Sequence, residues 1–291
     1  MSDLLDPSFL RELEALRRRL EIRARSGAAG ERASSRRGSS AEFADHRPYS
    51  AGDDPRRIDW AVYARTGEPF LKLYRAEEDA IARLLVDASA SMRFGVPQKL
   101  DVARRLAAAV GYMALARLER AQLIEGRDGA VRAHPTVRGR SSLPALLASL
   151  GAVEARGKGD LAQAVDAVIR RSARPGLLVV LSDFLDGGAV LSSLGRARAA
   201  GHDVALVHVV APEEESPALE GDLALVDAET GDEIDFTADA AALDAYVRRY
   251  LGLCEELAAH AKKHGARYVR VRTNDALEGA VRRLVSRGVD G

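Results

Sequence analysis

The sequence predicts an α/β fold with a doubly wound, mostly parallel sheet and an N-terminal extension. Two apolar runs, at 84–86 and 177–181, have the continuous hydrophobic character of strands that are buried on both faces. Segments of helical periodicity alternate with such runs from residue 81 onward, as in successive βαβ units. Both runs end in an aspartate with a neighbouring serine, which places these side chains at the sheet edge where open α/β folds bind ligands.

Residues 1–75 are expected to form the extension, and residues 76–291 the sheet domain. A helix is predicted at 7–25 because leucines recur at three- and four-residue steps. These leucines are Leu10, Leu13, Leu16 and Leu20. The Gly-, Ala-, Ser- and Arg-rich stretch at 26–40 is typical of a flexible linker.

The sheet domain is expected to contain strands and helices in alternation. Its strands are predicted at 81–86, 121–125, 130–134, 177–181, 202–210 and 267–271, and a further strand is predicted at 70–74, within the extension. Helices are predicted from Lys99 to Met113, at 141–150, 160–171, 190–200 and 243–261, and at the C-terminal end to about Ser286. An additional hairpin is expected at 221–236, because Ala228-Glu-Thr-Gly231 separates two runs of alternating polarity.

The first strand runs into Asp87-Ala-Ser89-Ala-Ser91, with one carboxylate and two hydroxyls at alternate positions. These ligands are all oxygens, which suits a hard cation such as Mg²⁺. The alternative is an Asx or Ser turn that closes the strand.

This D-x-S-x-S string resembles the metal-ion-dependent adhesion site (MIDAS) of von Willebrand factor A domains. Those domains are doubly wound α/β folds that hold Mg²⁺ at the top of the first strand. The resemblance implies that Ser89 and Ser91 ligate the metal directly, while Asp87 acts through water or hydrogen bonds. It also implies a second aspartate at the end of a later strand, for which Asp183 is the candidate.

One loop departs from the pattern of that family. Its usual threonine is replaced by Gly159, which offers no hydroxyl. The neighbouring Asp160 could replace the threonine, although the first residue before a helix more often serves as the N-cap. The resemblance therefore implies weak binding of Mg²⁺, for which Mn²⁺ could substitute.

Residues 42–65 resemble the signature of the bacterial "domain of unknown function 58" family, roughly E-F-x-x-x-R-x-Y-x-x-G-D-D-x-R-x-I-D-W-x-x-x-A-R. In that family an A-type domain with the D-x-S-x-S string follows, as it does here, and the resemblance extends to about Val210. Arginine forks against aspartates make bidentate bonds, and we expect a buried junction that locks this segment onto the A domain. The alternative is a partner-docking surface. The residues concerned are Arg47, Asp53, Asp54, Arg56, Arg57, Asp59, Trp60 and Arg65.

Composition restricts the classes of function. The 43 basic and 43 acidic residues cancel, so the overall charge does not indicate a nucleic-acid partner. The single Cys254 excludes an intramolecular disulfide and a cysteine-based zinc site. No apolar run approaches the roughly 18 residues of a membrane span, and a cytoplasmic location is expected.

These observations predict a non-enzymatic, metal-dependent protein–protein interaction module. Genes of the family often lie beside those of MoxR-type AAA+ ATPases, and the resemblance implies such an ATPase as the partner in a chaperone-like or assembly role. The sequence contains no P-loop of its own. The alternatives are a metal-dependent hydrolase or phosphatase, and nucleic-acid binding through the Arg-rich N-terminus. Ser89 argues against a haloacid-dehalogenase-like phosphatase, which has a second aspartate there as its general acid.

Overall fold

A computed structural model describes residues 3–27, 42–50, 52–75, 80–117, 119–127, 130–172, 174–185 and 187–285. The chain divides into two compact units, one made of Met1–Ala24 with Ala80–Gly291 and the other of Arg25–Asp79. The N-terminal helix is therefore part of the larger unit and not of the extension, contrary to the boundary expected from the sequence. The reason is its buried apolar side, where Phe9, Leu13 and Leu16 join the core of the larger unit.

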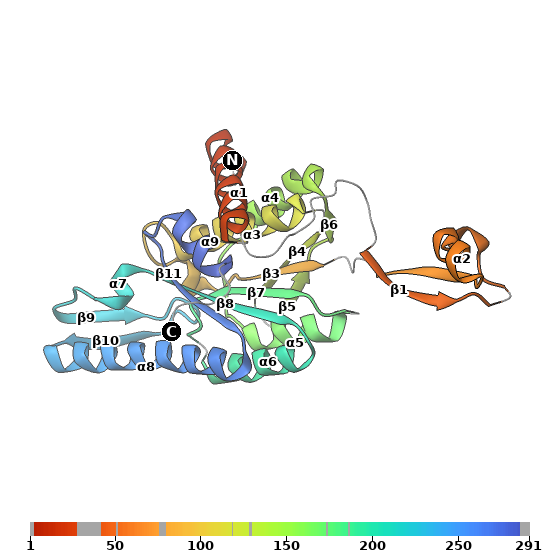
Figure 1. Ribbon diagram of the computed structural model, residues 1–291. Helices are drawn as coiled ribbons and strands as arrows, with labels where there is room; N and C mark the ends of the chain where they lie inside the picture. The colour runs from red at the N-terminus through yellow and green to blue at the C-terminus, as the bar shows by residue number, and fades with distance from the viewer. Residues whose placement is uncertain are drawn as a thin grey trace. The chain divides into compact units, whose positions relative to one another are not determined.

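The larger unit is built on one sheet with helices on both faces (Figure 1). Its strands are β3 (Ile81–Asp87), β4 (Arg120–Arg127), β5 (Ala130–Ala133), β6 (Val137–Arg138), β7 (Leu177–Ser182), β8 (Asp203–Val210) and β11 (Arg267–Arg272). Its longer helices are α1 (Pro7–Gly27), α3 (Lys99–Ala116), α4 (Leu143–Gly151), α5 (Leu161–Arg171), α6 (Gly188–Ala199), α8 (Ala240–His264) and α9 (Leu277–Val285). Short helical turns are η1 (Asp3–Leu5), η3 (Ala90–Arg93), η4 (Arg140–Ser142) and α7 (Pro212–Glu215).

The sheet has the order β11-β8-β7-β3-β4-β5, with β6 also paired to β4. The pairs β3–β4, β3–β7, β7–β8 and β8–β11 are parallel, whereas β5 and β6 pair with β4 antiparallel. The chain thus winds outward in one direction from β3 to β5 and in the other from β7 to β11. The predicted doubly wound, mostly parallel fold is confirmed, and its switch point lies between β3 and β7, where such sheets bind ligands.

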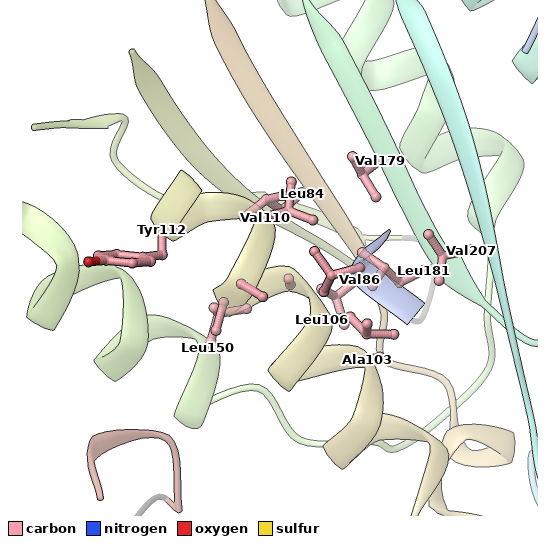
Figure 2. Close-up of a cluster of buried hydrophobic side chains, with 14 of the residues drawn as sticks. Leu84, Val86, Ala103, Leu106, Val110, Tyr112, Leu150, Val179, Leu181 and Val207 are labelled. Atoms are coloured by element: carbon pink, nitrogen blue, oxygen red, sulfur yellow. The ribbon is translucent and has the colours of Figure 1, made fainter. Parts of the chain in front are cut away.

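Alternate residues of the central strands face two separate cores. Leu84 and Val86 of β3 pack with α3 on one face, together with Val179 and Leu181 of β7 (Figure 2). Leu85 points to the other face, which α5, α6 and α8 cover. Because both faces are covered, the strands carry apolar residues without alternation, as the sequence indicates.

A hairpin occupies the residues for which an insertion is expected. Strands β9 (Gly221–Val226) and β10 (Glu233–Ala238) pair antiparallel with each other and form a two-stranded sheet of their own. Their connecting turn places Glu229 in contact with a loop of the main sheet.

The smaller unit consists of β1 (Glu42–Pro48), η2 (Pro55–Arg57), α2 (Trp60–Thr66) and β2 (Phe70–Arg75). The two strands pair antiparallel with each other, and β2 contains the strand predicted at 70–74. Asp59 caps α2 by accepting hydrogen bonds from the backbone N–H groups of Ala61 and Val62. Gly67 ends the helix at φ 73°, a conformation that glycine adopts without steric cost.

Truncation of Leu13 tests whether α1 belongs to the core of the larger unit. The side chain of Leu13 is 1% exposed, so Leu13→Ala is expected to lower the free energy of unfolding by about 2–5 kcal/mol. Urea denaturation measures this change. The matched control is Leu5→Ala, whose side chain is 44% exposed and which is expected to stay within about 0.5 kcal/mol of the parent. Equal effects of the two substitutions would contradict the packing of α1.

Candidate metal and partner-binding site

Asp87 is the last residue of β3 and is held at both carboxylate oxygens. Its Oδ1 accepts a hydrogen bond of 2.9 Å from the backbone N–H of Ser89. Its Oδ2 accepts a hydrogen bond of 2.6 Å from the Ser182 hydroxyl, at the end of the neighbouring strand β7. That hydroxyl in turn accepts from the backbone N–H of Phe184. The carboxylate is therefore buried and fixed in orientation, and it ties the ends of the two central strands together.

Ser89 and Ser91 present their hydroxyls to the same point. Their Oγ atoms are 3.0 Å apart. Two oxygens bound at right angles about 2.1 Å from an octahedral Mg²⁺ also lie about 3 Å apart. The spacing of these two hydroxyls therefore fits two adjacent positions of such a shell.

The loop between α4 and α5 is held against this motif by two backbone hydrogen bonds. Ala90 donates to the carbonyl of Gly157, and Arg156 donates to the carbonyl of Ala88, both at 2.9 Å. These bonds bring Gly159 beside Ser89: a Cβ added at Gly159 would lie 3.2 Å from the Cβ of Ser89 and 3.7 Å from its Oγ. The loop thus has the position that the resemblance implies for the missing threonine.

Asp160 is the residue that precedes helix α5. Its Oδ1 accepts a hydrogen bond of 2.9 Å from the backbone N–H of Gln163, so it acts as the N-cap of α5. This is the capping role given as the alternative from the sequence, and it engages one of the two carboxylate oxygens. The carboxylate that does approach the loop is Glu229, whose Oε1 accepts a hydrogen bond of 3.4 Å from the N–H of Gly159.

Asp183 follows β7 and is paired with a buried lysine. The Lys99 ammonium lies 2.7 Å from Asp183 Oδ2 and 2.6 Å from Glu214 Oε1. Lys99 is 1% exposed, although it is the first residue of α3. Burial acts to lower the pKa of its ammonium, but the charges and hydrogen bonds of the two carboxylates outweigh burial, and the pKa lies above its ordinary value. Lys99 is therefore a cation at the sheet edge.

The charge of Asp183 acts on the buried carboxyl of Asp87. Burial and, to a smaller extent, the negative charge of Asp183 raise the pKa of Asp87, and hydrogen bonds from Ser182 and Ser89 oppose the rise; the net result is a pKa of about 6. His208, also buried nearby, has its pKa lowered by burial to about 4 and adds no positive charge near neutral pH. Lys99 is consequently the cation that faces Asp183 among the described residues.

These donors fit a divalent cation in part. In the described part of the chain, no three His, Cys, Asp or Glu side chains come together as a metal cluster. The groups that fit are the two serine hydroxyls, with Asp87 acting through hydrogen bonds. Asp183 lies at the same edge, but its charge is already compensated by Lys99.

The 42–65 segment bonds largely within the smaller unit. Arg47 donates to Asp53 Oδ1 at 2.7 Å, and Asp53 Oδ2 accepts from the N–H of Ser50. The remaining bonds of the segment are Asp54 Oδ1 to the N–H of Arg56, Asp59 Oδ2 to His46 Nε2, and Arg65 Nε to the carbonyl of Ala61. The side chain of Arg57 lies outside the described residues. These aspartates therefore stabilise a turn and a helix start in this unit.

Trp60 lies on the surface of helix α2 in the smaller unit. Its side chain is 63% exposed and lies edge-on to Tyr63, with ring centroids 5.9 Å apart. It is the first residue of α2, directly after the Asp59 cap, and this register turns it outward. Within the smaller unit, a side chain in this position contributes little to a core.

The sheet order, the switch point and the strand-end aspartate with its two serines define a von Willebrand factor A-like domain, here combined with a small α/β unit. The chain itself belongs to the DUF58 family, a protein family of unknown function whose model matches residues 45–252. An uncharacterized protein of Mycobacterium tuberculosis, Rv1480, is 34% identical over 256 residues, which cover 86% of this chain and 80% of that protein. A second uncharacterized protein, from Mycobacterium avium, is 37% identical over 132 residues, which cover 45% of this chain and 77% of that protein.

Solved structures with a similar fold share little sequence with this chain. The conserved hypothetical protein BatB from Bacteroides thetaiotaomicron is 18% identical with a TM-score of 0.46, covering 70% of this chain and 97% of that one. An aerotolerance-related membrane protein from Bacteroides fragilis is 17% identical with a TM-score of 0.49, covering 70% and 95%. The SpRpn10 VWA domain is 10% identical with a TM-score of 0.43, covering 73% of this chain and 99% of that one.

In the present chain, none of the described helices combines the length and apolarity needed to cross a membrane.

The raised pKa of Asp87 gives a pH dependence of stability with a defined sign. The Asp87 carboxyl group holds its proton more tightly in the folded protein than in the unfolded chain, where its pKa is near 3.8. The contribution of Asp87 to the free energy of unfolding therefore falls as the pH rises from about 4 to about 6, and is constant above that window. Asp87→Asn is expected to remove this fall. Urea denaturation in EDTA at a series of pH values measures the free energy of unfolding of both proteins. If the difference between Asp87→Asn and the parent stays constant between about pH 4 and about pH 6, the raised pKa of Asp87 is contradicted.

Proposed function

We propose that this protein is a non-enzymatic module that grips a carboxylate of a protein partner through a divalent cation held at Ser89 and Ser91. The observation that carries the proposal is the 3.0 Å separation of the two hydroxyl oxygens at the switch point of the sheet. This separation suits adjacent ligands of Mg²⁺, and Mn²⁺ prefers the same donors.

The residues around the two serines have supporting roles in this proposal. Asp87 fixes the backbone of Ser89 by accepting its N–H, and Ser182 fixes Asp87. Mg²⁺, when bound, would supply open coordination positions and a positive charge for an incoming carboxylate. Two neutral protein ligands leave much of an octahedral shell to water, so the ion is expected to bind loosely until the partner contributes a charged ligand.

The partner that the family resemblance suggests is a MoxR-type AAA+ ATPase, with a chaperone-like or assembly role in the cytoplasm. The present sequence contains no G-x-x-x-x-G-K-[ST] motif, so ATP hydrolysis in such a pair would be the work of the partner. The exposed Trp60 and Tyr63 of the smaller unit offer aromatic side chains of the kind that protein interfaces favour. They support the docking interpretation of this segment.

Calorimetric titration with Mg²⁺ tests the site. The parent is expected to bind weakly, and Ser89→Ala is expected to abolish the binding because it removes one of two direct ligands. Gly159→Thr is expected to strengthen it, since a side chain at this position starts 3.7 Å from Ser89 Oγ and adds a third hydroxyl. Ser192→Ala, at an exposed serine of α6, is the matched control and should leave binding unchanged.

The same variants test the partner. A MoxR-type ATPase from the same organism should be retained by the parent in Mg²⁺ and released in EDTA, and Ser89→Ala should fail to retain it while Ser192→Ala succeeds. Retention that is insensitive to EDTA and to Ser89→Ala would contradict metal-mediated binding. Hydrolysis of a phosphate ester that depends on Asp87 would contradict the non-enzymatic role.

A further inference from the structure

Lys99 is the residue at the sheet edge that neither the motif nor the proposed function uses. It begins α3, yet its side chain turns inward and is 1% exposed. A cation at the N-terminus of a helix is unfavourable with respect to the helix dipole, and an unpaired buried ammonium is far more so. This position is stable because the two carboxylates of Asp183 and Glu214 meet the ammonium.

The ammonium is held in place from several sides. Asp183 comes from the end of β7, and Glu214 from the short helix α7 that follows β8. Glu214 is itself anchored, because its Oε2 accepts a hydrogen bond of 2.8 Å from the N–H of Ala211. The ring of Phe94 covers a further side, with its centroid 5.7 Å from Nζ. Lys99 is thus a fixed charge and not a loose side chain.

We propose that Lys99 is a built-in counter-ion that sets the metal affinity of the site. Its ammonium compensates the charge of Asp183, the carboxylate that would otherwise attract and retain a divalent cation beside Ser89 and Ser91. The ion is then attracted mainly by Asp87, and it stays only when a partner carboxylate adds negative charge. This inference rests on the proposed function and explains why metal and partner bind together: each supplies charge that the other needs.

Competition for Asp183 follows from the geometry. Its Oδ2 faces Nζ at 2.7 Å, and its Oδ1 accepts a long bond of 3.5 Å from the N–H of Leu185. A divalent ion near Asp87 is repelled by Lys99 Nζ. It is also attracted less by Asp183, because that carboxylate already forms an ion pair with Lys99. Removal of the ammonium therefore frees negative charge at the site and removes a positive charge from it, and both changes favour metal binding.

The test replaces Lys99 with Met, which keeps the length of the side chain and removes its charge. Calorimetric titration with Mg²⁺ is expected to show affinity higher than that of the parent by at least about tenfold, because one repulsive charge is lost and one carboxylate is freed. Mg²⁺ is also expected to raise the melting temperature of Lys99→Met more than that of the parent. Lys262→Met, at an exposed position of α8, is the control and should match the parent in both measurements.

Two carboxylates without their cation can prevent folding, since uncompensated buried charge is strongly destabilising. Circular dichroism checks the fold. Lys99→Met/Glu214→Gln is the second variant, because it removes one of the two stranded charges and leaves Asp183. It is expected to show the same gain in Mg²⁺ affinity as the single variant. A folded variant of either kind that binds Mg²⁺ no more tightly than the parent would overturn the inference.

The double variant Ser89→Ala/Lys99→Met shows where the additional Mg²⁺ affinity of Lys99→Met arises. The gain is expected to disappear with this hydroxyl, because the ion sits at the serines. A gain that persists without it would mean that the metal simply replaces the ammonium between Asp183 and Glu214, which overturns the inference. If the parent binds weakly and Lys99→Met does the same, the role of Lys99 fails and the proposed function stands. If neither binds Mg²⁺ at all, both fail.

Discussion

The buried ion pairs of Lys99 with Asp183 and Glu214 are the constraint on which the carboxyl edge of the sheet depends. They connect the start of α3, the end of β7 and the short helix after β8, three segments that are far apart in the chain. Because a buried charge without a partner is costly, these segments are stabilised together or not at all. The bond from Ser182 to Asp87 adds β3 to the same assembly.

The position of the site follows from the way the core is built. Residues 84–86 alternate between two apolar cores, and the strand changes from apolar to polar at its last residue, Asp87. Strand β3 is therefore packed on both faces up to Asp87, the residue that orients Ser89 by accepting its backbone N–H. A site on such a scaffold needs few direct ligands, since the backbone hydrogen bonds of Ala90 and Arg156 already fix the two loops relative to each other.

The larger features of this structure could be predicted because they arise from local patterns. Apolar runs specify the central strands, and the D-x-S-x-S string directly identifies the residues that follow the first of them. The domain boundary was harder to predict, because the side of α1 that carries Leu13 and Leu16 does not indicate which unit it contacts. The orientation of Trp60 was also hard to predict, because its register after the Asp59 cap, and not its aromatic character, decides that it lies on the surface of α2.

Lys99 and Glu229 could not be found from local sequence, because their partners lie 84 and 70 residues away. Lys99 did carry a weak signal. It is a lysine in a chain whose basic residues are mostly arginine, and it lies at a helix start, where a positive charge is unfavourable. A lysine at a helix start points to a functional role only if its side chain is buried, and the burial of Lys99 is seen only in the tertiary structure.

The central claim is that a divalent cation binds between the two serine hydroxyls. Anomalous diffraction from crystals soaked in Mn²⁺ tests it most directly. A manganese peak is expected in contact with both Ser89 Oγ and Ser91 Oγ, with Asp183 still bound to Lys99. A peak between Asp183 and Glu214, or no peak at this edge of the sheet at saturating Mn²⁺, would contradict it.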